Sequence, residues 1–321
     1  RINSKVFYFT TCGWMMWNWL VSGLLLKSTI YLFDGSPFFP NAEILWDYVD
    51  HEKINFMGVS AKYIDALSKE NVNIINKYNL SDLEIIGSTG SPLIHESFDY
   101  IYKCVKTDVL VASLSGGTDI VGCFIGGNPM SVVRRGEIQG SILGMDVHVY
   151  NENGEPIKNE KGELVCTQTF PTMPLFFWND EKNEKYHNAY FNKYPNVWCH
   201  GDYIAKTEND GFIIFGRSDA TLNPGGVRIG TSEIYRQVEQ IEEVLEGLVV
   251  GQIWQGDTRV VLFVRLNPNS NLTEVLINKI KNKIKMGASP RHVPAKIILV
   301  NDIPRTKSGK IAELAVRDLI H

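Results

Sequence analysis

Short apolar runs of strand length alternate with longer stretches of helical length along residues 1–135. The runs that predict buried strands are 5–10, 29–33, 56–59, 84–88 and 108–112. Helices are predicted over 14–26, 44–52 and 62–69, where apolar side chains recur at helical spacing or fill a helix-length segment. Strands that alternate with helices in this way predict a mainly parallel α/β sheet.

The pattern changes after residue 135. Residues 146–150, 162–167, 198–200 and 211–216 predict short strands separated by turn clusters, which is typical of a β-rich portion with the shape of a distorted barrel. Residues 232–240 and 272–285 predict helices, and 249–254, 260–265 and 295–300 predict strands. We therefore expect two domains, an α/β domain at 1–218 with its barrel-like β-rich portion at 136–218, and a small α+β domain at 219–321.

Composition narrows the class of protein. The 321 residues are 44% hydrophobic with a formal net charge of −4, which suits a globular chain with a large core and excludes a disordered tail or a fibre. The slightly acidic balance argues against nucleic-acid binding, which needs a basic face. Five widely spaced cysteines without a CxxC pair indicate reduced thiols in the cytosol rather than a zinc site or disulfide framework.

Residues 6–26 carry no formal charge and are numerous enough to cross a bilayer. Gly13, Asn18 and Gly23 interrupt the segment, which favours a buried strand, turn and helix. A membrane span is the weaker alternative, and no signal peptide is indicated because no basic segment precedes a small-residue cleavage site.

Two glycine-containing loops each follow a predicted strand. In residues 87–92 the small side chains allow the backbone to approach a flat ligand at the carboxyl end of the sheet, although a plain strand-to-helix turn has the same composition. In residues 113–119 the adjacent hydroxyl and carboxylate of Thr118 and Asp119 can hold a phosphate oxygen and Mg²⁺. The alternative for the second loop is a helix N-cap.

Two further segments carry charge. Asp202 follows a glycine in the segment 198–202, and Arg217 lies in the segment 216–219. A carboxylate suits the two hydroxyls of a ribose, and an arginine suits hydroxyls or phosphate oxygens. Lys310 lies in the basic loop 304–311, which can bring an ammonium to a developing negative charge. The alternatives are a turn carboxylate, a surface arginine and a solvated basic turn.

Taken in this order, the loops resemble the motifs of the adenylate-forming acyl-CoA synthetase superfamily over nearly the whole chain. Segments 113–120, 223–231 and 303–310 are most similar to members that activate acetoacetate. Members form an acyl-adenylate from a carboxylic acid and ATP and then transfer the acyl group to coenzyme A. The resemblance implies an acid–thiol ligase that uses ATP/AMP, Mg²⁺ and coenzyme A, with acetoacetate as the favoured acid.

The resemblance also implies a role for each matched residue. It assigns the adenine pocket to Gly90, Ser91 and Pro92, the α-phosphate to Thr118, and the vicinity of Mg²⁺ to Asp119, which replaces the usual glutamate. It assigns the ribose to Asp202 and Arg217, the adenylation step to Lys310, and the coenzyme A channel to Gly226 and Arg228. Asp219 matches the hinge about which the small C-terminal domain rotates, so that domain is expected to be mobile.

Acid size is predicted from Gly116. Acetyl-CoA synthetases carry a tryptophan at the matching position, and the glycine pair Gly116 and Gly117 is expected to open room for a longer acyl chain. A small keto or branched acid is therefore favoured. Met15 and Met16 are expected either to form another wall of this pocket or to pack in the core.

The phosphate-gripping loop of the family, rich in Ser, Thr and Gly and ending in Pro-Lys, is not found in the 321 residues. The chain therefore resembles the C-terminal part of a longer enzyme, and we expect little or no activity from it alone. Two other functions remain open, a non-catalytic scaffold of the same fold and an adenylating domain that loads a carrier protein. The expected partners are a small acid, ATP and coenzyme A, with no nucleic acid, membrane span or obligate protein partner.

Overall fold

The computed structural model describes residues 3–306 and 310–320. Residues 307–309 of the basic loop lie outside the described residues. Contacts between Cα atoms divide the chain into two compact units. The first unit comprises Arg1–Glu160, Val165–His200 and Lys206–Ile213, and the second comprises Lys161–Leu164, Gly201–Ala205 and Ile214–His321.

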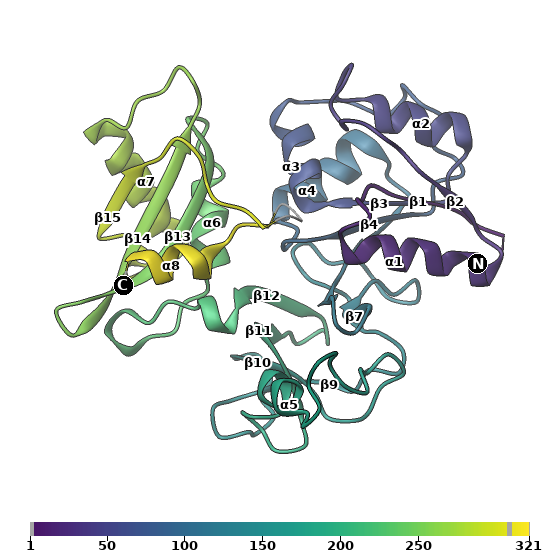
Figure 1. Cartoon of the computed structure of the whole chain (residues 1–321). Coiled ribbons are helices and arrows are strands. Elements are labelled where there is room, and N and C mark those ends of the chain that lie inside the picture. Colours follow the sequence, from purple (N-terminus) through teal and green to yellow (C-terminus); the bar gives the residue numbers. More distant parts are fainter. Residues whose placement is uncertain (1–2, 307–309, 321) are drawn as a thin grey trace. The chain divides into compact units, whose positions relative to one another are not determined.

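A five-stranded parallel sheet forms the centre of the first unit (Figure 1). Its order is β2-β1-β3-β4-β5, and each neighbouring pair runs parallel. The strands are β1 (Lys5–Tyr8), β2 (Thr29–Tyr31), β3 (Phe56–Ser60), β4 (Ile85–Thr89) and β5 (Leu110–Ser113). The helices between them are α1 (Met15–Ser22), the 3₁₀ turn η1 (Gly23–Leu26), α2 (Ile44–Glu52), α3 (Ala61–Lys69), α4 (His95–Tyr100) and the π-helical turn η2 (Ile101–Val105).

Helices cover both faces of this sheet. Successive side chains of a strand point to opposite faces, so neighbouring residues pack against different helices. Phe7 of β1 belongs to the large core with the buried side chains of α2, α3 and α4, whereas the next residue, Tyr8, packs with Met16 and Leu20 of α1. Figure 1 shows α1 on the opposite side of the sheet from α2, α3 and α4. Burial on both faces explains the continuous apolar runs of these strands, as expected for a parallel sheet.

The segment after the parallel sheet forms two open sheets. β6 (Ser115–Gly117), β7 (Gly122–Gly126) and β8 (Gly140–Ser141) make one, in sequence order. The other sheet consists of β9 (Val147–Tyr150), β10 (Lys161–Cys166), β11 (Trp198–Lys206) and β12 (Phe212–Arg217), in the order β12-β11-β10-β9. The division of the chain into units falls within β10, β11 and β12. The described residues contain no closed barrel, so the barrel-like expectation for 136–218 gives way to open sheets.

The C-terminal part of the second unit is an α+β module. β13 (Val244–Trp254) and β14 (Asp257–Leu266) form an antiparallel hairpin, and β15 (Lys296–Leu299) pairs parallel with β14. Val249 packs with α6 (Thr231–Val238) and α7 (Glu274–Gly287), whereas its neighbour Val250 packs with α8 (Glu313–Ile320). Three short 3₁₀ turns complete this part of the chain: η3 (Ser218–Ala220), η4 (Pro224–Gly226) and η5 (Pro290–His292).

The mixed α/β and α+β fold class predicted from the sequence is confirmed. The helix expected after the loop 87–92 is α4, whereas α5 (Glu184–Tyr190) and α8 were not predicted, because each is short and lies beside turn or loop residues. The uncharged segment 6–26 divides into β1, α1 and η1. Within the described residues, no helix is both long and apolar enough to cross a bilayer.

Met57 of β3 tests the core of the first unit. Its side chain is fully buried in the sheet–helix core, so Met57→Ala is expected to lower the free energy of unfolding by about 2–5 kcal/mol. The control Met130→Ala removes a methionine that is 90% exposed and should leave stability nearly unchanged. Urea denaturation followed by circular dichroism measures both, and equal losses would contradict this description of the core.

Glu233 tests the start of α6. Burial opposes its ionisation, but His292, the Lys161 ammonium and the Gly230 amide, which donates to Oε2 at 2.9 Å, lower the pKa from 4.5 to about 2. A carboxylate whose pKa is lowered in the folded state stabilises it above the unfolded pKa, and this stabilisation is lost as pH falls through the folded pKa.

We expect the unfolding free energy to fall between about pH 4.5 and pH 2 in the unaltered protein, and Glu233→Gln to flatten this dependence. Urea midpoints measured across this pH range check the prediction. The matched control is Glu274→Gln at the exposed start of α7, which should preserve the original slope. A slope that is unchanged in Glu233→Gln would contradict the prediction.

Candidate active site

The first two glycine loops meet at one edge of the parallel sheet. They follow β4 and β5, which are adjacent parallel strands with Ser88 paired to Ser113. The Leu114 amide donates to the Ser88 carbonyl at 2.9 Å, and the Thr89 hydroxyl donates to the Leu114 carbonyl at 3.0 Å. Gly90 and Ser91 follow as exposed residues, with Pro92 half-buried. The carboxyl edge of an open parallel sheet is the usual place for a ligand.

The second loop contains a strand. Residues 115–117 form β6, which pairs antiparallel with β7 through Gly116 opposite Cys123 and Gly117 opposite Gly122. Thr118 and Asp119 lie in the exposed turn that follows, where the Thr118 carbonyl accepts from the Val121 amide at 3.2 Å. The structure therefore places a hairpin turn at this point instead of the helix N-cap considered from the sequence.

Asp119 is bound to an aromatic cluster. Its Oδ2 accepts a hydrogen bond from the hydroxyl of Tyr190, the last residue of α5. The Tyr190 ring stacks on Trp198 of β11, with centroids 3.6 Å apart and an interplanar angle of 13°. Trp198 is buried, so the exposed carboxylate of Asp119 is connected to a rigid part of the first unit.

His200 connects β11 to the glycine pair. Its Nε2 lies 3.1 Å from the Gly116 carbonyl oxygen, and its ring contacts Phe124 edge to face. A Cβ atom at Gly117 would lie 2.7 Å from Cε1 of this ring. The imidazole of the buried His200 therefore fills the space beside Gly117.

The two residues expected at the ribose lie together in the second unit. The Arg217 guanidinium donates from Nη1 to Asp202 Oδ1 at 3.1 Å, and its Nε lies 3.6 Å from Asp219 Oδ1. Burial opposes the charge of Arg217, but the two carboxylates outweigh this effect and raise its pKa. Gly201 has a φ of +79°, a backbone conformation that favours glycine, and a Cβ there would lie 2.7 Å from Arg217 Nη2.

Arg228 is held by a buried carboxylate in the second unit. Its Nη2 donates to Glu163 Oε1 at 3.2 Å, and its guanidinium lies 4.6 Å from the centre of the Tyr203 ring. The other oxygen of Glu163 accepts from the hydroxyl of Ser218, next to Asp219. Glu163 thus connects both ends of the segment 218–228. Gly226 lies inside this segment, in η4, and is exposed.

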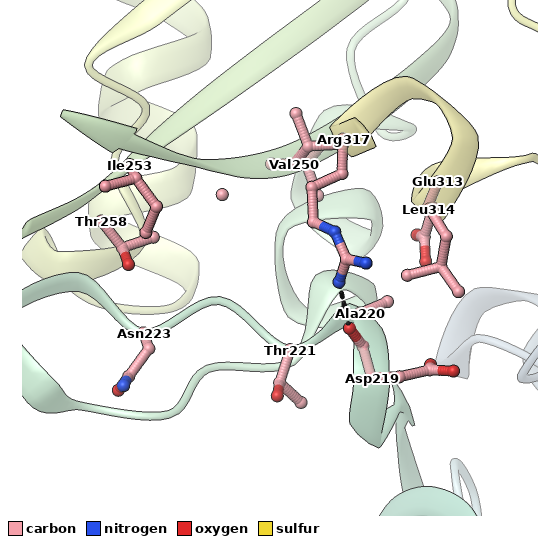
Figure 2. Close-up of a pocket in the computed structure, with 12 residues that line it drawn as sticks. Asp219, Ala220, Thr221, Asn223, Val250, Ile253, Thr258, Glu313, Leu314 and Arg317 are labelled. Carbon is pink, nitrogen blue, oxygen red and sulfur yellow. Dashed lines mark hydrogen bonds between the residues drawn. The ribbon is translucent and has the colours of Figure 1, made fainter. Parts of the chain in front are cut away.

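Asp219 borders a cavity of about 320 Å³ within the second unit, lined by η3, β13, β14 and α8. Figure 2 shows the Arg317 side chain extending from α8 to the backbone carbonyl of Asp219, where Nη1 donates at 2.8 Å. Burial raises the pKa of Glu313 on the same helix, although the Tyr235 hydroxyl donates to it. The backbone of the residue expected at the hinge is therefore hydrogen-bonded to a side chain of α8.

Lys310 lies beside a short bridge between Arg305 and Ile311. The Thr306 amide donates to the Lys310 carbonyl at 2.8 Å, and the Lys310 amide donates to Thr306 Oγ1 at 3.2 Å. The side chain is exposed, and its ammonium forms no ion pair with any described residue. Within the described ranges, no group of three or more His, Cys, Asp or Glu side chains could hold a metal ion.

The chain is similar over its whole length to curated proteins. It is 59% identical over 321 residues to the acetoacetyl-coenzyme A synthetase of Rhizobium meliloti (strain 1021), covering 100% of this chain and 49% of the relative. It is 46% identical over 320 residues to the acetoacetyl-CoA synthetase of Danio rerio, covering 99% of this chain and 48% of the relative. The chain is a homologue of the acetoacetyl-CoA synthetases. The chain spans about half the length of these curated relatives.

Solved structures agree with this homology. Acetoacetyl-CoA synthetase from Streptomyces lividans has a TM-score of 0.92 and 41% identity, covering 99% of this chain and 49% of that one. The anthranilate CoA ligase AuaEII has a TM-score of 0.78 at 20% identity, covering 100% of this chain and 60% of that one, which supports the fold alone. No protein-family profile matches the chain. The resemblance to acyl-CoA synthetases predicted from the loops is confirmed.

The structure corrects the reasoning about acid size in this homologue. A Cβ atom at Gly116 would lie 2.0 Å from the Gly122 carbonyl oxygen and 2.5 Å from the Cys123 Cα. The backbone of β7 therefore occupies the volume that was expected to be open pocket. Met16 packs in the buried cluster with Tyr8 and Leu20, and Met15 packs against the same cluster.

Sequence reasoning missed four residues that hold the candidate site residues. Tyr190 binds Asp119, His200 packs on Gly117, Glu163 binds Arg228, and Arg317 binds the Asp219 carbonyl. For Glu163 the available signal was a charged residue inside an otherwise apolar run, since such residues are buried only when paired. The other three contacts join positions between 71 and 98 residues apart, so no local pattern indicates them.

Gly116 gives a test of the corrected packing. Gly116→Ala is expected to lower the free energy of unfolding by about 1–3 kcal/mol or more, because the new methyl group meets backbone atoms that cannot rotate away. Gly140→Ala is the matched control in the same three-stranded sheet, since a Cβ there has no atom within 4 Å. Thermal unfolding of both variants measures the difference. Equal stability would contradict the close approach of β6 and β7.

Proposed function

We propose that this chain forms part of an acid–thiol ligase that activates acetoacetate with ATP and transfers the acyl group to coenzyme A. In the first step the carboxylate attacks the α-phosphorus and pyrophosphate leaves, forming acetoacetyl-adenylate. In the second step the thiol of coenzyme A displaces AMP and forms the thioester. The observation that carries this proposal is the 59% identity to an acetoacetyl-CoA synthetase over every residue of the chain.

In the first unit we assign the nucleotide to the loops after β4 and β5. The adenine would bind at Gly90, Ser91 and Pro92, and the α-phosphate would bind at Thr118. Gly116 and Gly117 would shape the second loop just before Thr118. The hydrogen bonds that join the two loops support this assignment. Backbone and small side chains at the carboxyl edge of a parallel sheet suit a flat base and its phosphate.

The carboxylate of Asp119 is a suitable ligand for Mg²⁺ in a nucleotide site. Mg²⁺ in such sites is bound by one or two carboxylates together with phosphate oxygens and water, so a complete protein cage is not required. Asp119 is exposed, and its Oδ1 accepts no hydrogen bond from the described residues. When bound, the ion would offset negative charge on the phosphates.

In the second unit we assign the ribose hydroxyls to Asp202 and Arg217. A buried aspartate can accept from two hydroxyls, and the hydrogen bond from Arg217 orients its carboxylate. We assign Gly226 and Arg228 to the coenzyme A channel. Release of Arg228 from Glu163 would accompany that use, because the guanidinium pairs with that buried carboxylate here.

Lys310 is assigned to adenylation. Attack of a carboxylate on a phosphate brings two anions together, and a compact ammonium near both offsets the repulsion in the transition state. The exposed side chain of Lys310 without an ion pair among the described residues supports this role. We place the domain boundary at residues 218 and 219, with Asp219 as the hinge that allows the mobile small domain to serve both steps.

The proposed reaction also bears on the partners and the cellular location of the protein. The reactants are small molecules, so the reaction needs no protein, nucleic-acid or membrane partner. All five cysteines are free thiols, which fits the cytosolic location that we propose.

Lys310→Ala separates the two steps. The chain replaces the aligned half of the Rhizobium meliloti synthetase, and the hybrid is assayed with acetoacetate, ATP, Mg²⁺ and coenzyme A. We expect the unaltered hybrid to form acetoacetyl-CoA, and Lys310→Ala to lower pyrophosphate exchange by about 10²–10³-fold, as for removal of one preorganised charge-stabilising group. Thioester formation from supplied acetoacetyl-adenylate should be nearly unchanged.

Lys283→Ala, on the exposed side of α7, is the matched control and should leave both steps intact. A hybrid that activates acids other than acetoacetate, or loads a carrier protein in preference to coenzyme A, would contradict the proposed substrates. Equal loss of both steps in Lys310→Ala would contradict its assigned role.

A further inference from the structure

Tyr190 is the residue outside the sequence motifs whose contact bears most directly on the candidate nucleotide site. Its hydroxyl donates to Oδ2 of Asp119, and the two residues are 71 positions apart. Asp119 is otherwise exposed at the tip of the β6–β7 hairpin. One oxygen of its carboxylate is thus held by a fixed donor, and the other accepts no hydrogen bond from the described residues.

The position of the Tyr190 hydroxyl is set by packing. The ring stacks on Trp198, which is 1% exposed, and also contacts Phe177 edge to face. Aromatic contacts of this kind fix the plane of a ring and leave few rotamers. The hydroxyl is therefore a preorganised donor.

The backbone of α5 is also fixed. Oδ1 and Oδ2 of the buried Asp180 accept from the Lys185 amide at 3.1 Å and the Tyr186 amide at 2.9 Å. These two contacts fix the start of α5, the helix whose last residue is Tyr190.

The chemistry of the donor suits a carboxylate that binds a cation. A lysine or arginine in the same place would neutralise Asp119, whereas the neutral phenol restricts its rotation and leaves its negative charge. Hydrogen-bond partners of metal-binding carboxylates have this orienting effect on metal affinity.

We propose that Tyr190 is a positioning residue for Mg²⁺–nucleotide binding, because its hydroxyl orients Asp119 so that the free carboxylate oxygen is available to the ion. This inference rests on the proposed function, which assigns Asp119 to Mg²⁺. Tyr190 itself contacts neither the nucleotide nor the ion in this role.

The test measures nucleotide binding, without turnover, by the hybrid in which the chain replaces the aligned half of the Rhizobium meliloti synthetase. Isothermal titration with ATP gives a dissociation constant in Mg²⁺ and another in EDTA, and the ratio of the two reports the contribution of the ion. Tyr190→Phe keeps the ring and removes the hydroxyl, and it should reduce this ratio by about tenfold, as for loss of an orienting hydrogen bond to a metal ligand. The EDTA value should remain within about twofold of the unaltered hybrid, since the ion is absent there.

Tyr186→Phe is the matched control, because it removes a hydroxyl from the same helix and the same aromatic cluster without touching Asp119. It should keep the original ratio. In the Asp119→Asn chain, adding Tyr190→Phe should cause no further loss. Thermal unfolding curves set an assay temperature at which every variant is folded.

The possible results distinguish the role of Tyr190 from the role of Asp119 and from the proposed function. An unchanged ratio in Tyr190→Phe, an equal loss in Tyr186→Phe, or a further loss in the Asp119→Asn background would overturn the inference while leaving the proposed function intact. ATP binding that Mg²⁺ does not strengthen in the unaltered hybrid would overturn the roles of both Asp119 and Tyr190. Absence of ATP binding by the hybrid that carries the unaltered chain would overturn the proposed function itself.

Discussion

The parallel pairing of β4 with β5 is the constraint on which the candidate nucleotide loops depend. Parallel neighbours bring their carboxyl ends to the same edge, so the segments that follow residues 89 and 113 must start side by side. The Thr89 hydroxyl then fixes one loop to the other through the Leu114 carbonyl. Helices on both faces of the sheet leave this edge as the place where small, exposed residues can meet a ligand.

Paired polar groups hold most of the charged candidate side chains in place. Asp202 binds Arg217, Glu163 binds Arg228, and Tyr190 binds Asp119. A buried charge is costly without a partner, and Asp202 and Glu163 are both buried, so these contacts restrict where the charges can lie. Ligand binding at Arg217 or Arg228 would therefore exchange an existing contact for a new one. Lys310 has no such ion pair within the described part of the chain.

The close approach of β6 and β7 changes how the Gly116–Gly117 pair is understood. At Gly116 the backbone of the opposite strand fills the space of a side chain, and at Gly117 the His200 ring does so. Both glycines therefore serve the packing of the hairpin that carries Thr118 and Asp119. Preference for a particular acid must arise from other side chains of the site, because no open volume lies in the direction of a Cβ atom at either glycine.

The sequence by itself determined the elements whose pattern is local. Apolar runs and helical spacing located the five parallel strands, the helices α1 to α3 and the strands β13 and β14, and the order of the loops was specific enough to indicate the synthetase family. Only the tertiary structure decided that residues 136–218 form open sheets, that Gly116 faces backbone, and that Tyr190, Glu163 and Arg317 hold the site residues. The physical reason is range: periodicity and turn chemistry act over a few neighbouring residues, whereas these contacts join positions that only the packed chain brings together.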